Sequence, residues 1–359
     1  MQFSTLLCPY EVVKGLFWTT GPIVLDNQGN IYLGYDEYSI VKYSPKGEEL
    51  LRMGRRGEGP GDLRRLSSYA YNPKDNLIYV TEYFEGNRRI SMFTTEGKFA
   101  GAWNFEMDWL KYGVVCAIDF DNQGNVLLEV EKQSVKRFKD FSVDNSKKEL
   151  LKFSPKGKLL ASIYRMSADS SGSTTANFTA TIPFQNSMNW VIFQNKIIVK
   201  ETSSDFISIL SPEGKLEKKI PFPVKKEKVT DKDIENWENH LNSARWIQEL
   251  QSRGRGNVKF WSKRLPFPAY KPNSSSISVD ANGNLYVREY TQFYSEQKKR
   301  DPIWFKINLQ NGNIARLKFK AGEELSLIWK NYFIFFKIDE DEEEMTTITK
   351  IEEKELQKW

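Results

Sequence analysis

The chain has 359 residues, a formal net charge of +5, 40% hydrophobic residues and 14% aromatic residues. This composition is that of a globular protein and excludes disordered and collagen-like chains, and the length alone suggests about two domains. One histidine, His240, and two cysteines, Cys8 and Cys116, exclude a multi-histidine metal site, a zinc cluster and a disulfide framework. A histidine-based catalytic triad would have to use His240, which we interpret as a surface residue.

The first segment, Met1–Tyr10, lacks the basic region and the long apolar core of a normal signal peptide. Leu6-Leu7-Cys8 is faintly similar to a lipoprotein cleavage site, but we favour a strand with a buried cysteine. No run of about 18 apolar residues is present, so the sequence predicts no membrane span. Asn177-Phe178-Thr179 and Asn273-Ser274-Ser275 fit the glycosylation pattern, which is common by chance.

A repeated turn organises the chain. An Asp-x-x-Gly-Asn turn between two apolar strands occurs from Ile23 to Leu33, from Ala117 to Leu128 and from Ile277 to Val287. The Asp and Asn side chains cap their own turn, and the glycine adopts the positive φ that the turn needs. Weaker copies occupy 71–80, 191–199 and 327–335.

A second turn of the type Ser-Pro-x-Gly follows five of these copies. Its glycines are Gly47, Gly97, Gly157, Gly214 and Gly312. Each unit therefore holds four short antiparallel strands joined by two tight turns, which is one blade of a β-propeller. The sequence predicts an all-β fold: one domain, residues 1–359, with six four-stranded blades.

The sixth unit has predicted strands near Leu325–Trp329, Tyr332–Ile338 and Met345–Ile351, and it lacks an outermost strand. We expect the N-terminal segment, Phe3–Leu7 or Val12–Phe17, to supply that strand. Such pairing would close the ring and cover two sheet edges at once.

These two turn patterns resemble those of NHL-type and TolB-like six-bladed propellers. The loop Gly54–Leu63 resembles the hallmark of a bacterial six-bladed propeller family of largely unassigned function. The resemblance covers nearly the whole chain and implies the fold, but it says little about activity. Members of that family are often exported or lipid-anchored, so it implies a periplasmic or cell-surface location.

The lengths of the connections predict which face is functional. Numbering the strands of a blade from the inside outward, the turns between strands one and two and between strands three and four are short and share one face. The long connections share the opposite face, here called the long-connection face. They are Met53–Leu66, Trp103–Val114, Lys132–Lys148, Arg165–Asn189, Pro221–Ser276 and Tyr290–Pro302. Binding residues gather on long loops of a rigid scaffold, so we expect the site there and at the channel mouth.

A helical insertion is predicted over residues 225–264, between the fourth and fifth blades. Thr230-Asp231-Lys232-Asp233 supplies a capping start, and Arg253–Asn257 ends the helix. Apolar side chains recur at three- and four-residue steps. They are Ile234, Trp237, Leu241, Trp246 (slightly off register), Ile247 and Leu250. The insertion is either a lid packed over the ring or a docking helix for a partner.

Polar residues end the second strands on the long-connection face, among them Glu129 and Glu201. These residues either bind a polar ligand or form hydrogen bonds between blades. The glycine-rich loop after the first blade is not a dinucleotide fingerprint, because Pro60 interrupts it; it is either a structural loop or a site for an anion. The candidate binding residues are Tyr35, Asp36, Arg55, Arg56, Glu82, Tyr83, Arg88, Trp246, Arg288, Glu289 and Tyr290.

We interpret the repeated aspartates Asp26, Asp121 and Asp280 as turn residues rather than metal ligands. No cofactor is expected, although an all-oxygen calcium site on the long-connection face stays open because Ca²⁺ needs no histidine. The favoured function is a monomeric, non-enzymatic scaffold that binds a protein, peptide or glycan. The alternative is a hydrolase or lyase with a channel metal, like lactonase-type propellers. RNA binding through the basic insertion is a third, weaker option, since a charge of +5 is too small to imply a nucleic-acid partner.

Overall fold

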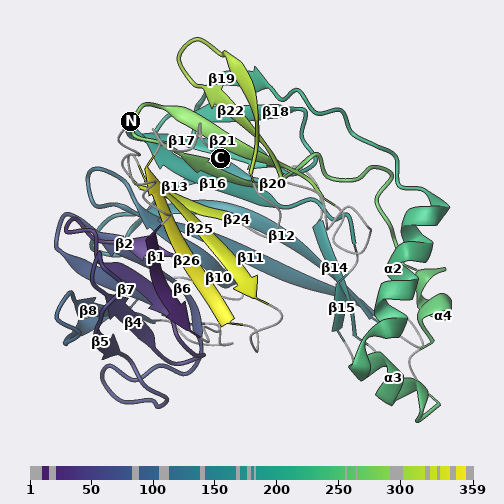
Figure 1. Cartoon of the computed structure of the whole chain (residues 1–359), viewed down its shortest axis with the longest axis horizontal. Coiled ribbons are helices and arrows are strands. Elements are labelled where there is room, and N and C mark those ends of the chain that lie inside the picture. Colours follow the sequence, from purple (N-terminus) through teal and green to yellow (C-terminus); the bar gives the residue numbers. More distant parts are fainter. Residues whose placement is uncertain are drawn as a thin grey trace, which may run out of the picture.

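The computed structural model describes residues 10–15, 22–82, 89–104, 113–137, 142–166, 170–175, 179–181, 183–254, 257–263, 265–291, 302–319, 324–329, 332–339 and 345–352. Within these residues the strands form six antiparallel sheets that follow one another along the chain (Figure 1). Five of the sheets have four strands each, and in four of these each strand pairs with the next along the chain, as in the blades of a β-propeller.

Four of the five regular sheets are built from consecutive strands. The first holds β2 (Val24–Leu25), β3 (Ile31–Gly34), β4 (Ile40–Tyr43) and β5 (Glu49–Met53). The second holds β6 (Leu66–Asn72), β7 (Leu77–Glu82), β8 (Arg89–Thr94) and β9 (Phe99–Asn104). The fourth holds β16 (Met188–Phe193), β17 (Lys196–Glu201), β18 (Phe206–Leu210) and β19 (Leu216–Pro221). The fifth holds β20 (Ser274–Val279), β21 (Asn284–Glu289), β22 (Ile303–Asn308) and β23 (Ile314–Lys318).

The third sheet corrects the prediction of six regular four-stranded blades. It has six strands: β10 (Val114–Phe120), β11 (Val126–Arg137), β12 (Ser142–Phe153), β13 (Leu159–Arg165), β14 (Ser170–Thr175) and β15 (Thr179–Thr181). The ladder between β11 and β12 continues without a break from Val126↔Phe153 to Arg137↔Ser142. The sequence predicted a connection over Lys132–Lys148, because this polar stretch lacks the apolar alternation of a half-buried strand. Five blades are thus regular, and one sheet is extended.

The last sheet is built from both ends of the described chain. It holds β24 (Glu324–Trp329), β25 (Tyr332–Asp339), β26 (Met345–Glu352) and, outermost, β1 (Tyr10–Gly15). The pairing of β1 with β26 runs from Tyr10↔Lys350 to Gly15↔Thr346. Closure by the N-terminal segment is confirmed for the second of the two predicted candidates, whereas Phe3–Leu7 lies outside the described residues.

The apolar core lies between the sheets rather than within them. In the described residues, buried clusters join each sheet to the next along the chain, for example Ile198 of β17 with Leu285 of β21. A further cluster joins the last sheet to the first, where Ile334 of β25 packs with Ile31 and Val41. The sheets therefore form a closed ring.

Three helices follow β19 within the described residues: α2 (Asp231–Ser243), α3 (Arg245–Gln251) and α4 (Val258–Ser262). Thr230 is the N-cap of α2 and forms a capping box with Asp233. Instead of one continuous helix, the chain breaks at Ala244, whose backbone is extended (ψ 129°). In Figure 1 the helices lie together at one edge of the molecule. None of the helices in the described part of the chain is long and apolar enough to cross a membrane.

The helices share a hydrophobic core of their own. Trp237, Ile247, Val258, Trp261 and Leu265 are buried against one another, and every described member of this cluster lies between β19 and β20. Two backbone hydrogen bonds join the chain just before the helices to the chain just after them. The Val229 N–H donates to the Ala269 carbonyl (3.1 Å), and the Lys271 N–H donates to the Glu227 carbonyl (2.8 Å). We call Thr230–Pro268 the helical segment, and Glu227–Val229 with Ala269–Lys271 its stem.

Candidate functional site

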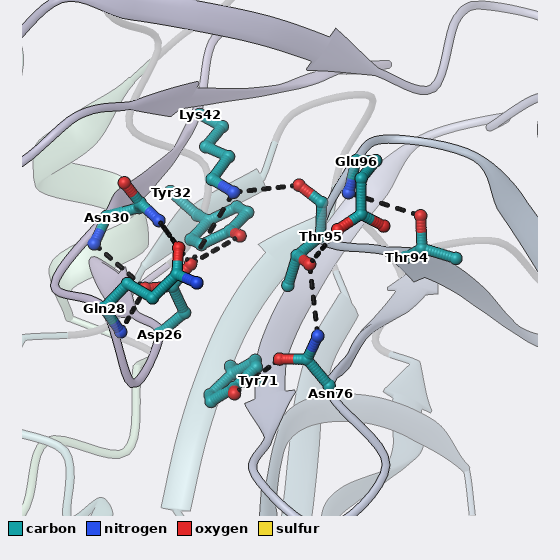
Figure 2. A network of polar contacts seen from close by, with 10 residues as sticks. All are labelled: Asp26, Gln28, Asn30, Tyr32, Lys42, Tyr71, Asn76, Thr94, Thr95 and Glu96. Carbon is teal, nitrogen blue, oxygen red and sulfur yellow. Dashed lines mark hydrogen bonds and ion pairs between the residues drawn. The ribbon is translucent and has the colours of Figure 1, made fainter.

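The short-turn face is occupied by a repeated hydrogen-bond network. Asp26 Oδ1 accepts from the backbone N–H groups of Gln28 (2.9 Å) and Asn30 (3.0 Å), and Oδ2 accepts from the Asn30 amide (2.8 Å) and the Tyr32 hydroxyl (3.0 Å) (Figure 2). Asp121 and Asp280 make the same backbone and Asn contacts in the third and fifth sheets. The interpretation of these aspartates as turn residues is confirmed.

Buried lysines extend this network between sheets, which the sequence interpretation missed. Lys42 Nζ lies 3.7 Å from Asp26 Oδ2 and donates to the carbonyl of Thr95 in the next sheet (2.9 Å; Figure 2). Lys152 Nζ lies 2.8 Å from Asp121 Oδ2 and donates to the carbonyl of Pro212 (3.0 Å). A signal was present: lysine occupies this place on the third strand in the three units whose turn has the full Asp-x-x-Gly-Asn pattern. These are Lys42, Lys152 and Lys306.

The glycine-rich loop after the first sheet holds a carboxylate of its own. Asp62 accepts from Arg55 Nε (2.7 Å) and from the Gly59 N–H (2.9 Å). A Cβ on Gly57 would overlap Asp62 Oδ2, so only glycine leaves room for that carboxylate. Hydrogen bonds from Arg55 and from the Gly59 N–H hold the pKa of Asp62 below its usual range. The geometry favours the structural interpretation of this loop over an anion site.

Other candidates in the first two sheets also have local partners. The Arg56 guanidinium lies 5.4 Å from the ring centre of Tyr38. The Tyr35 ring lies 4.0 Å from the Arg52 guanidinium. Asp36 Oδ1 accepts from the Tyr38 N–H (2.7 Å) within a local turn. Tyr83 and Arg88 lie outside the described residues, and the side chain of Trp246, in α3, is not described.

Three glutamates end the second strands of the second, fourth and fifth sheets: Glu82, Glu201 and Glu289. Glu82 is buried, and its Oε1 lies 3.4 Å from the backbone nitrogen of Arg64 and 3.8 Å from Arg89 Nη2. Glu201 accepts from the Tyr164 hydroxyl (2.7 Å) and the Asn186 amide (2.8 Å). Both carboxylates thus have protein partners, as expected for contacts that hold a scaffold together.

Glu289 differs from these two. Its Oε2 is buried and has no hydrogen-bond partner among the described residues, and the same is true of the Ser274 and Ser275 hydroxyls. Burial raises the pKa of Glu289 above its ordinary value. The neighbouring candidate Tyr290 donates its N–H to the Asn273 carbonyl (3.3 Å). The structure therefore brings Arg288, Glu289 and Tyr290 together with three residues that the sequence did not single out as ligand contacts: Asn273, Ser274 and Ser275.

Asn273 is fixed by a buried lysine. Lys200 Nζ donates to the Glu201 carbonyl (2.8 Å), the Ser204 carbonyl (2.7 Å) and Asn273 Oδ1 (2.8 Å). The Asn273 amide in turn donates to the carbonyls of Ser204 (2.9 Å) and Val224 (3.2 Å). Because the Asn273 side chain is buried and its amide nitrogen donates to two carbonyls, this nitrogen is not accessible for glycosylation in the folded protein. Burial lowers the pKa of Lys200 to about 7.

Among the described residues, no group of three or more His, Cys, Asp or Glu side chains is arranged to hold a metal ion. Asp119 lies on β10, the innermost strand of the third sheet. Burial raises the pKa of this carboxyl to about 6. Its Oδ1 accepts from the N–H of the next residue, Phe120 (2.8 Å).

Comparison with known proteins defines the fold. A "putative exported protein" from Bacteroides fragilis is 10% identical, with a TM-score of 0.54 over 94% of this chain and 91% of its own. A member of the DUF4221 family from Bacteroides vulgatus is also 10% identical, with a TM-score of 0.52 over 95% of this chain and 94% of its own. At this identity the likeness shows a shared propeller fold alone. The sequence matches no family model and no curated protein, so NHL or TolB-like membership is not shown.

Proposed function

We propose that the protein is a non-enzymatic binding scaffold that engages a protein, peptide or glycan through its long-connection face. In this proposal the extended third sheet counts as a blade, which makes the ring a six-bladed propeller of the NHL or TolB-like type. The helical segment is then an insertion between the fourth and fifth blades. The short turns of the ring lie on the face opposite the long connections, where buried Asp and Lys side chains link neighbouring sheets.

The helical segment is the observation that carries this proposal. It leaves β19 at the end of a fourth strand and returns at the start of β20, a first strand, so its stem starts from the long-connection face. Its apolar side chains are buried against one another rather than against the sheets. An appendage with its own core presents a rigid surface without being needed to hold the ring together.

The test is to remove the helical segment without disturbing the ring. Val229 and Ala269 are hydrogen-bonded neighbours, so Thr230–Pro268 can be replaced by an Asn-Gly turn. We expect the shortened protein to keep its melting temperature within a few degrees and to lose the partner that the full chain captures from its host. The exposed turn variant Glu213→Gln is the control and should retain the partner. Equal capture by all three proteins would contradict the proposal.

An exported location belongs to the same proposal, because one structure with this fold is named a "putative exported protein". Fractionation of the native host should place the protein outside the cytoplasm. The competing function, a channel-metal hydrolase or lyase, predicts that Ca²⁺ raises the melting temperature of the shortened protein as well, since a bound ion stabilises the folded state.

A further inference from the structure

Two strands of the fifth sheet present unsatisfied oxygen atoms on the long-connection face. Ser274 of β20 is paired directly with Glu289 of β21, so the two side chains project from the same side of the sheet. Ser274 is 0% exposed, yet its hydroxyl has no partner among the described residues, and neither has Glu289 Oε2. Buried polar atoms normally have partners, and an unmet one costs about 1–3 kcal/mol.

The backbone at this place is irregular. The pairing of β20 with β21 shifts between Ser274 and Ile277, and Ser275, whose hydroxyl also lacks a partner in the described structure, lies in this bulge. Bulges often re-aim side chains next to functional sites. Immediately before the bulge, Asn273 is fixed by its contacts with Lys200 and two carbonyl groups. Ser274 and Ser275 therefore follow directly after a residue that is held in place.

The chemistry of these oxygens favours a ligand that donates hydrogen bonds. A carboxylate and serine oxygens can all accept hydrogen bonds, and an ammonium group has three N–H donors to give. A calcium ion would need six to eight oxygen ligands, usually with several carboxylates. Two charged groups influence Glu289 electrostatically: Arg316, and Glu227 of the stem, which carries the same charge as Glu289. A bound cation would relieve that repulsion and the burial of Glu289.

The same end of the fourth sheet already contains such an arrangement. The Lys200 side-chain nitrogen is buried, and it donates to three oxygen atoms at 2.7–2.8 Å. Lys200 shares Asn273 with the residues next to the unsatisfied cluster, so this region of the fold already places an amine nitrogen among three acceptor oxygens.

We propose that Ser274, Ser275 and Glu289 form a binding site for a primary ammonium group, such as the amino terminus of a peptide or the end of a polyamine. This inference rests on the proposed binding function and specifies its ligand class. Glu289 supplies the charge, and the two serine hydroxyls accept the remaining N–H groups.

The test is calorimetric titration of the purified full chain with four probes: a tri-alanine amide, its N-acetylated form, spermidine and CaCl₂. We expect the free amine of the peptide, of spermidine or of both to bind, and the acetylated peptide to fail. Glu289→Gln should weaken binding about 10- to 100-fold, since a charge-assisted hydrogen bond is lost. Ser274→Ala should weaken it about 5- to 10-fold. Binding should also fade at acid pH as Glu289 becomes protonated.

Glu48→Gln, on the opposite face, is the matched control and should bind like the wild type. Glu289→Gln removes the charge from a side chain whose Oε2 is buried without a hydrogen-bond partner among the described residues, so its melting temperature should not fall, and weak binding cannot be attributed to unfolding. Equal binding of the free and acetylated peptides, unchanged binding by Glu289→Gln, or binding of Ca²⁺ alone would overturn the inference. Partner loss on removal of the helical segment is measured separately, so either proposal can fail while the other stands.

Discussion

The two faces of the ring differ in how completely their buried carboxylates are hydrogen-bonded. On the short-turn face, Asp26 and Asp121 have the same partners in different sheets, and a lysine links each to the following sheet. On the long-connection face, equivalent glutamates have unlike surroundings: Glu201 has two donors, whereas one oxygen of Glu289 is buried with none in the described structure. Repeated contacts hold the scaffold together, whereas the one departure from the repeated pattern described here lies at the site that we propose for an ammonium group.

The largest effect is expected where the repeated network is cut. Asp121→Ala would leave the buried Lys152 ammonium without its carboxylate and would remove the cap from the turn. Loss of one member of a buried ion pair costs about 3–5 kcal/mol, so the free energy of unfolding in urea should fall by about that amount. Adding Lys152→Met should restore part of the loss. A loss below about 1 kcal/mol would show that the network is dispensable.

The same network predicts acid sensitivity. Burial alone would raise the pKa of Asp121, but the Lys152 ammonium and Asn125 outweigh it and hold that pKa below its ordinary value. A lowered carboxyl pKa stabilises the fold above the unfolded-state pKa, and this contribution disappears as the pH falls through the lower, folded-state value. The stability difference between wild type and Asp121→Ala should therefore shrink in acid.

Much of this scaffold could be predicted from the sequence because its causes are local. Asp26, Gly29 and Asn30 form their turn with neighbours within four residues, so the pattern itself carries the geometry. The strand β1 could be predicted for a different reason: a sheet short of one strand leaves an edge to be covered, although its partner β26 lies at the other end of the chain. The third sheet was mispredicted because the second half of β11 is polar and gains its pairing from β12.

A medium effect is expected where glycine allows neighbouring sheets to approach. Gly214 has φ +85°, and a Cβ there would lie 2.7 Å from the Ile163 carbonyl oxygen of the preceding sheet. Gly312 has φ +78° in the same kind of turn, with nothing within 4 Å of the added Cβ. Gly312→Ala should cost about 1–2 kcal/mol for the left-handed backbone alone, and Gly214→Ala about 1–3 kcal/mol more for the overpacked contact. Equal losses in chemical denaturation would show that the Gly214 turn does not pack against the preceding sheet.

The candidate site was less accessible to sequence reasoning. Glu82, Glu201 and Glu289 occupy matching positions, and two of them even share the dipeptide Glu-Tyr. What distinguishes Glu289 is that its Oε2 has no donor among the described residues, and the presence of a donor depends on side chains remote in sequence, such as Tyr164 for Glu201. Lys200 was missed for the same reason: its acceptors include Asn273, which lies 73 residues away.

The smallest effect concerns Lys200 and tests whether the base of the proposed site is built as described. Burial lowers its pKa from 10.5 to about 7, so between these values the unfolded chain binds a proton that the folded chain does not. Stability rises with pH wherever the unfolded state binds more protons. The free energy of unfolding of the wild type, relative to Lys200→Met, should therefore rise by about 1 kcal/mol per pH unit just above neutrality. Lys232→Met, at an exposed helix position, should show no such slope. A flat difference for Lys200→Met would mean that the ammonium keeps its proton, and that the three oxygens around it stabilise the charge as fully as water does.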